Sequence, residues 1–357
     1  MATVLFPLIL IFSACGWGGV ITVSADPSEQ EVQFTSGNDT LYGSLLLPDL
    51  QPGQKVPAAV IISGSGPTDR DGNSALLNGR IDVNRNFAQT LVNRGIASLR
   101  YDKLGTGKTG VGSFGNHPAD VGFNLFVDEA QSAYAYLRSR PEIDPQHVMI
   151  LGHSEGGLIA LVIANQLKGT PDQPAALALA APLGSPYLET IQRQFTSQYR
   201  AAQAAGAISQ ADADAAINEL NAIIRSLVET QHLPATITTP SLQQIFNPYN
   251  EKFLAQVAPW DPMQLAASLP PTLPALILHG TKDVQVSSDD VNRVYRGFQM
   301  AGNARAAFFD LANVDHVFKE IPGDPNPGVE YIDPTLPFSH EAVDRLNTFV
   351  SGSILAS

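Results

Sequence analysis

The sequence predicts an α/β fold, with a mostly parallel central sheet covered by helices and an inserted helical cap. Short, fully apolar segments alternate with helical patterns, which is typical of parallel strands buried on both faces. This alternation stops between residues 186 and 269 and then resumes. With 357 residues and 44% apolar side chains, the chain can bury a substantial core.

The predicted elements follow in order along the chain. Residues 33–47 alternate around the turn Ser36-Gly37-Asn38-Asp39, which predicts an antiparallel hairpin. Apolar runs predict the remaining strands, at 58–62, 96–101, 148–151, 176–181, 275–278 and 306–311. Between and after them, helical patterns lie at 86–94, 124–138 and 343–350.

We interpret residues 186–269 as a helical cap inserted between two parts of one core domain, 26–185 and 270–357. Ser209 with Asp212 predicts the N-terminal cap of a helix. The apolar side chains that follow at helical spacing predict its buried face: Ala213, Ile217, Leu220, Ile224, Leu227 and Val228. Another helix is expected around Leu188, Ile191 and Phe195, and the candidates for pocket lining are Phe246, Tyr249 and Trp260.

Composition argues against several classes of partner. The net charge of −13, with no Lys/Arg cluster, disfavours binding to a phosphate backbone, so no nucleic acid is expected. One cysteine permits neither an intrachain disulfide nor a thiolate metal site. No metal or other cofactor is expected, because the chain has no H-E-x-x-H or calcium-loop pattern. Nothing in these patterns predicts the oligomeric state.

Residues 1–25 are interpreted as an export signal. They contain no charged side chain, and an apolar run ends in small residues. Val23-Ser24-Ala25 offers a cleavage site that would leave a mature chain starting at Asp26, in the periplasm or outside the cell. A lipid anchor on Cys15 and an uncleaved start are the alternatives.

The segment Gly152-His153-Ser154-Glu155-Gly156 is the strongest chemical signal. It joins an apolar strand to a helical pattern, which is the context of a G-x-S-x-G nucleophile elbow. The glycines relieve crowding in the sharp turn, and the turn lifts the serine oxygen above the sheet. Ser154 is therefore the candidate nucleophile.

A serine nucleophile needs an imidazole base and a carboxylate that orients it, in the chain order Ser, acid, His. Asp283 follows a strand end, where catalytic groups of open α/β sheets collect. His316 follows the next predicted strand after a short turn. Asp289 and Asp290 are interpreted instead as charges at a helix start. The remaining histidines have no comparable position: His117, His147, His153, His232, His279 and His340.

An oxyanion hole needs two backbone N–H groups. One is expected from Glu155, directly after the nucleophile, and the other from the loop after an early strand. The glycine-rich segment Ser63-Gly64-Ser65-Gly66-Pro67 is such a loop, and Ser65 occupies the donor position. An ordinary glycine turn is the alternative interpretation of this loop.

Two further segments extend these motifs, Thr68 to Asn73 and Leu99-Arg100-Tyr101-Asp102-Lys103-Leu104-Gly105-Thr106-Gly107. Together with the elbow, the chain resembles a bacterial secreted serine esterase family of the α/β-hydrolase superfamily, related to the serine aminopeptidase group. The resemblance covers most of residues 30–180 and 270–350, whereas the cap resembles no known family. It implies a catalytic triad of Ser154, Asp283 and His316, with Ser65 and Glu155 as oxyanion donors.

Two features depart from that family pattern. Leu104 replaces the basic residue often found after Asp-Lys, and a Pro-rich stretch at 323–337 follows the base. The charged loop residues Asp69, Arg70 and Asp71, with Asp102, are interpreted as structural, because such groups lock tight loops by local hydrogen bonds and ion pairs.

The leading hypothesis is hydrolysis of a small-molecule carboxylic ester through an acyl-enzyme on Ser154. The same triad could serve an aminopeptidase, for which Glu155 or a cap acid could bind a free amino terminus, or a thioesterase. A non-catalytic binding scaffold is the alternative from another class.

Overall fold

The structure is a computed structural model that describes residues 29–355. The predicted export signal, 1–25, and Cys15 lie outside the described residues. The described chain forms two compact units. The small unit contains residues 114–125 and 185–261, and the large unit contains 29–113, 126–184 and 262–355. No helix within residues 29–355 has the length and apolar character needed to cross a membrane.

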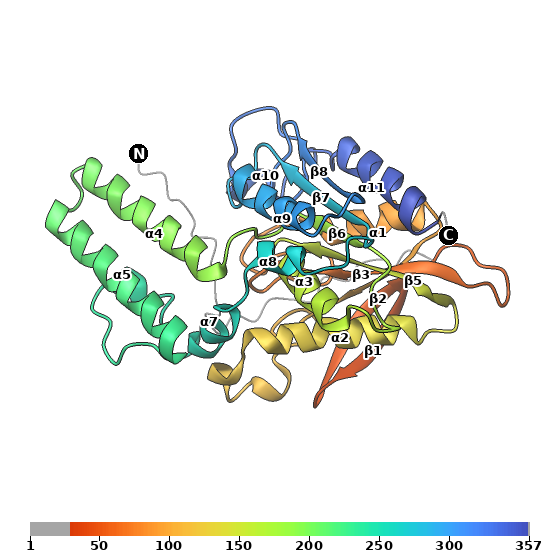
Figure 1. Ribbon diagram of the computed structural model, residues 1–357, viewed down its shortest axis with the longest axis horizontal. Helices are drawn as coiled ribbons and strands as arrows, with labels where there is room; N and C mark the ends of the chain where they lie inside the picture. Colours follow the sequence, from red (N-terminus) through yellow and green to blue (C-terminus); the bar gives the residue numbers. More distant parts are fainter. Residues whose placement is uncertain (1–28, 356–357) are drawn as a thin grey trace. The chain divides into compact units, whose positions relative to one another are not determined.

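The large unit is built on one eight-stranded sheet with the order β1-β2-β4-β3-β5-β6-β7-β8 (Figure 1). The predicted hairpin is confirmed as β1 (Glu29–Ser36) and β2 (Asp39–Leu46), and β2 pairs antiparallel with β4. All later pairings are parallel. The other strands are β3 (Val56–Ile62), β4 (Ala97–Tyr101), β5 (Ile143–His153), β6 (Leu177–Ala180), β7 (Ala275–Gly280) and β8 (Ala306–Leu311).

The predicted helices are also confirmed, each beginning slightly earlier than the sequence pattern indicated. They are α1 (Val83–Val92), α2 (Phe123–Arg138) and α11 (His340–Ser353). The other helices that belong to the large unit are α3 (Glu155–Leu167), α8 (Pro262–Ala267), α9 (Ser288–Met300) and α10 (Pro327–Glu330). Two short 3-10 turns, η1 (Gly112–Phe114) and η2 (Pro118–Asp120), precede α2.

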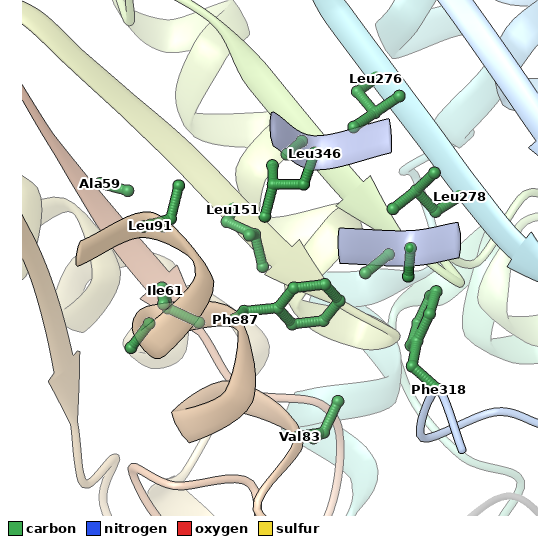
Figure 2. Close-up of a cluster of buried hydrophobic side chains, with 14 of the residues drawn as sticks. Ala59, Ile61, Val83, Phe87, Leu91, Leu151, Leu276, Leu278, Phe318 and Leu346 are labelled. Atoms are coloured by element: carbon green, nitrogen blue, oxygen red, sulfur yellow. The ribbon is translucent and has the colours of Figure 1, made fainter. Parts of the chain in front are cut away.

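Helices α1 and α11 cover one face of the sheet and form an apolar cluster with its strands. Figure 2 shows Phe87 of α1 pointing toward Phe318, among leucines of the strands and of α11. The two phenyl rings meet edge to face with centroids 5.3 Å apart. Phe318 lies two positions after His316, so this core anchors the loop that carries the candidate base. The Pro-rich stretch also adds Tyr331 and Ile332 to the cluster.

The small unit contains α4 (Tyr187–Ala204), α5 (Gln210–Thr230), α6 (Pro240–Gln243) and α7 (Glu251–Val257), which lie between β6 and β7 in the chain. Helices α4 and α5 pack against each other. The α5 cap is confirmed: Ser209 Oγ accepts from the Asp212 backbone N–H, and the Asp212 carboxylate accepts from the Ser209 N–H. The cap boundaries of 186–269 remain a prediction.

The predicted buried face of α5 was partly wrong. Val228 is 61% exposed, whereas Ile223 is fully buried. The observed buried positions alternate in steps of three and four, Ala213, Ala216, Leu220, Ile223 and Leu227. Such a seam is narrower than the stripe inferred from apolar residues alone. Of the aromatic candidates, Phe246 is buried and Tyr249 is 59% exposed; their role as pocket lining stays a prediction.

Candidate active site

The sheet order brings the sequence-predicted residues to one edge. Parallel strands end at a common edge, where α/β sheets collect their ligands. Ser65 follows β3, Ser154 follows the adjacent β5, Asp283 follows β7 and His316 follows β8. All of these residues belong to the large unit.

Ser154 is the single residue between β5 and α3, and its backbone is strained. Its φ of 55° and ψ of −121° lie where a side chain is rarely tolerated. The surrounding backbone fixes this conformation, because the Ser154 N–H donates to the Ala180 carbonyl at 2.9 Å and the Ser154 carbonyl accepts from the Gly157 N–H at 2.9 Å. This is the backbone conformation that the predicted nucleophile elbow requires.

The elbow glycines are required by close packing. A Cβ on Gly152 would lie 2.2 Å from the Gly156 carbonyl oxygen, and one on Gly156 would lie 2.3 Å from the Ile62 carbonyl oxygen. Gly157 has the same constraint against Pro182, at 2.7 Å. The strand, the turn and the helix therefore approach each other more closely than any side chain permits.

Asp283 and His316 form a direct pair. His316 Nδ1–H donates to Asp283 Oδ2 at 2.7 Å, and both side chains are almost completely buried. Asp283 Oδ1 accepts from the backbone N–H groups of Gln285, at 2.7 Å, and Val286, at 3.0 Å. The Asp283 carboxylate is thus held on both oxygens, and it fixes the imidazole tautomer that leaves Nε2 as the basic nitrogen.

The environment keeps Asp283 ionised. Burial by itself would favour the neutral acid, but the charge and hydrogen bond of His316 and the Val286 N–H together lower the pKa of Asp283. Asp289 and Asp290 lie in the first turn of α9, as predicted, and are not part of this pair.

His153, which the sequence analysis set aside as a candidate base, contacts the loop that carries His316. Its Nε2–H donates to the His316 carbonyl at 2.9 Å, and the two imidazole rings lie 4.9 Å apart. Burial and the nearby His316 lower the pKa of His153 to about 3, so the ring stays neutral. His153 therefore connects the elbow to the loop that carries His316. Both residues lie in the large unit.

The two predicted oxyanion donors have free backbone N–H groups. Within residues 29–355, neither the Ser65 nor the Glu155 N–H donates a hydrogen bond. The Ser65 loop lies against the elbow, since a Cβ on Gly64 would lie 3.1 Å from Ser154 Cβ. Glu155 begins α3, so its N–H is one of the donors that a helix leaves unpaired at its start.

The charged loop residues Asp69, Arg70 and Asp71 form hydrogen bonds and ion pairs, as the sequence predicts. Arg70 Nη2 and Nε donate to Asp102 Oδ2 at 2.6 and 3.0 Å, and Arg100 Nε donates to Asp71 Oδ1 at 3.0 Å. Asp69 accepts from the Asp71 and Asn73 backbone N–H groups. These contacts fix the segment that follows the Ser65 loop.

The sequence analysis missed a buried cluster of ionisable side chains beside the oxyanion loop. Lys103 donates to the Gly64 carbonyl at 2.5 Å, and Glu129 of α2 accepts from the Leu104 backbone N–H. The available signal was a lysine two positions after the end of a fully buried strand, because lysine is rarely buried unless its charge has a partner. Among the described residues, no group of three His, Cys, Asp or Glu is arranged to hold a metal ion.

Comparison with known proteins finds one matching family model. The family described as serine aminopeptidase, S33, matches residues 77–243, which is less than half of the chain. The match includes Ser154 and Glu155 and stops before Asp283. It also runs through α4 and α5, so the inserted segment, which resembled no family in the sequence, falls largely inside it.

Esterase EstD of Thermotoga maritima is 25% identical over 276 residues, which is 77% of this chain. The aligned region spans 58% of the length of that relative.

Two solved structures share the fold. Est1E of Butyrivibrio proteoclasticus, bound to ferulic acid, covers 91% of this chain and 100% of its own, with a TM-score of 0.56 and 16% identity. The Pyrococcus furiosus esterase PF2001 covers 94% and 96%, with a TM-score of 0.56 and 14% identity. The chain has the α/β-hydrolase fold, and over residues 77–243 it is similar to the family described as serine aminopeptidase, S33.

Proposed function

We propose that this protein is a serine esterase that hydrolyses small-molecule carboxylic esters through an acyl-enzyme on Ser154. The observation that carries the proposal is the strained backbone of Ser154, whose φ of 55° and ψ of −121° lie outside the ordinary left-handed region, because such strain clusters at active sites. The Asp283–His316 hydrogen bond and the names of the relatives, EstD and Est1E, support the same chemistry.

In the proposed reaction Ser154 Oγ attacks the ester carbonyl carbon while His316 Nε2 takes the hydroxyl proton. Asp283 stabilises the resulting imidazolium. The carbonyl oxygen becomes an oxyanion that accepts from the Ser65 and Glu155 N–H groups. Return of the proton from His316 to the leaving alkoxide gives the alcohol and the acyl-enzyme, and water repeats the sequence to release the acid.

An ester is favoured over a peptide by the position of Glu155. Recognition of a free amino terminus would use an accessible carboxylate, but Glu155 is only 3% exposed and interacts electrostatically with Lys103. Burial raises the pKa of Glu155 and so disfavours the charge that such recognition needs.

The test is covalent labelling with a fluorophosphonate, followed by mass mapping of the adduct. We expect one label, on Ser154, and loss of p-nitrophenyl ester turnover by several orders of magnitude in Ser154→Ala. Asp283→Asn should lower kcat by about 10⁴, because the imidazole loses its tautomer control. An unlabelled Ser154 would favour the non-catalytic scaffold. Faster turnover of aminoacyl arylamides or of thioesters than of matched esters would favour the aminopeptidase or the thioesterase.

Export is proposed on the sequence of residues 1–25 alone. Amino-terminal sequencing of the protein recovered from fractionated cells is expected to start at Asp26. Recovery of a lipid on Cys15, or of the uncleaved chain, would replace this proposal with the corresponding alternative.

A further inference from the structure

Lys103 is a buried lysine that contacts the oxyanion loop. It follows β4, is 6% exposed, and its Nζ donates to the Gly64 carbonyl at 2.5 Å. Gly64 immediately precedes the proposed donor Ser65 and packs against Ser154. The lysine is therefore one peptide unit away from the proposed site of negative charge.

Two buried acids accompany this lysine. Glu155 and Glu129 both interact electrostatically with Lys103, and Glu129 accepts from the Leu104 backbone N–H with both oxygens, at 3.1 and 3.2 Å. The side chains of all three residues are nearly inaccessible. Isolated buried charges are strongly unfavourable, so such a cluster is retained only where its members compensate one another.

The peptide unit between Gly64 and Ser65 connects this cluster to the proposed oxyanion hole. The Gly64 carbonyl and the Ser65 N–H belong to the same planar group, and the described chain has no cis peptide bond. In a trans peptide the C=O and N–H bonds point in opposite directions. A donor that holds the carbonyl oxygen on one side therefore turns the N–H to the other side.

We propose that Lys103 is a positioning residue for the oxyanion hole, which fixes and polarises the Gly64–Ser65 peptide so that the Ser65 N–H is a preorganised donor. This deepens the proposed esterase function and rests on it. A hydrogen bond to the carbonyl end of a peptide strengthens donation from its N–H end. Since charge on the substrate oxygen develops only in the transition state, Lys103 should act on kcat more than on KM.

The experiment compares Lys103→Met with the wild type, using kcat per active site titrated to completion with a fluorophosphonate. Active-site titration separates a change in kcat from a change in the folded fraction, because misfolded molecules do not react with the fluorophosphonate. We expect kcat per titrated site to fall about 10- to 100-fold, less than or equal to the loss of a whole oxyanion donor, while KM stays within about threefold. Lys103→Arg, which keeps a charged donor, should recover part of this loss.

Lys108→Met is the matched control, because Lys108 lies five positions further on and is exposed. It should leave both parameters unchanged. A Lys103→Met enzyme whose kcat per titrated site is within twofold of the wild type overturns the inference. If Lys103→Met yields no folded protein, the same comparison is made with Lys103→Gln, and the same criterion applies. A wild type that is neither labelled nor active would instead overturn the esterase proposal itself.

Discussion

At the scale of single residues, the candidate site combines one strained residue with several buried polar side chains. Ser154 has an unfavourable φ, while the residues His153 and His316 and the side chain of Asp283 are nearly inaccessible. Each buried group has a partner that fixes its orientation. The site is therefore organised before any substrate binds, which is what electrostatic preorganisation requires.

His153 should make the protein less stable in acid. Its pKa is lowered from 6.5 to about 3 in the folded state, so between these values the unfolded chain binds a proton that the folded chain does not. Stability contributed by neutral His153 is thus lost as the pH falls through this window. Relative to His153→Gln, the wild type should lose up to about 1.4 kcal/mol of unfolding free energy per pH unit between pH 6 and 4.

The measurement is urea unfolding of both proteins across this range. His232→Gln serves as the control, because His232 is exposed, with 75% of its side chain accessible. Parallel stability curves for the wild type and His153→Gln would show that the ring is not held neutral.

At the scale of elements, the turn between β5 and α3 depends on the absence of side chains. In Gly156→Ala the new Cβ would lie 2.3 Å from the Ile62 carbonyl oxygen, so backbone of β3 or α3 must move. We expect this substitution to lower the free energy of unfolding by about 1–3 kcal/mol.

Gly352→Ala is the matched control for this prediction. Gly352 lies in α11, and a Cβ there meets nothing within 4 Å. In a helix, alanine is favoured over glycine by up to about 1 kcal/mol, so the control should be neutral or stabilising. Equal destabilisation of both variants in chemical denaturation would contradict the steric argument.

What could be predicted from the sequence was also decided at the level of elements. Apolar strands and the elbow are local patterns, and Asp283 and His316 could be found because chain order and strand ends restrict the choice. The contact of His153 with His316 joins residues 163 positions apart, and that of Leu104 with Glu129 joins residues 25 apart. Such pairings depend on tertiary packing, which no sequence spacing encodes. The buried face of α5 was misjudged for the same reason, since a neighbouring helix decides which apolar residues it covers.

At the scale of the whole molecule, buried titratable groups give the stability opposite dependences on pH. His153 favours folding at higher pH, whereas buried acids with raised pKa values favour folding at lower pH. Burial raises the pKa of Glu129 to about 8 and that of Asp315 to about 6. Of His153, Asp315 and Glu129, only Glu129 has its folded-state pKa above 6.5.

Glu129 should therefore make the folded protein less stable as the solution becomes mildly alkaline. Because its folded pKa exceeds the ordinary value of 4.5, its contribution is complete below that pH and is lost as the pH rises toward 8. Relative to Glu129→Gln, the wild type should lose up to about 1.4 kcal/mol of unfolding free energy per pH unit between pH 5 and 8. Denaturant titrations at half-unit pH intervals measure this slope, and Glu229→Gln, which removes an exposed carboxyl from α5, controls for the loss of one negative charge. A difference between wild type and Glu129→Gln that does not change with pH would mean that Glu129 is ionised in the folded state.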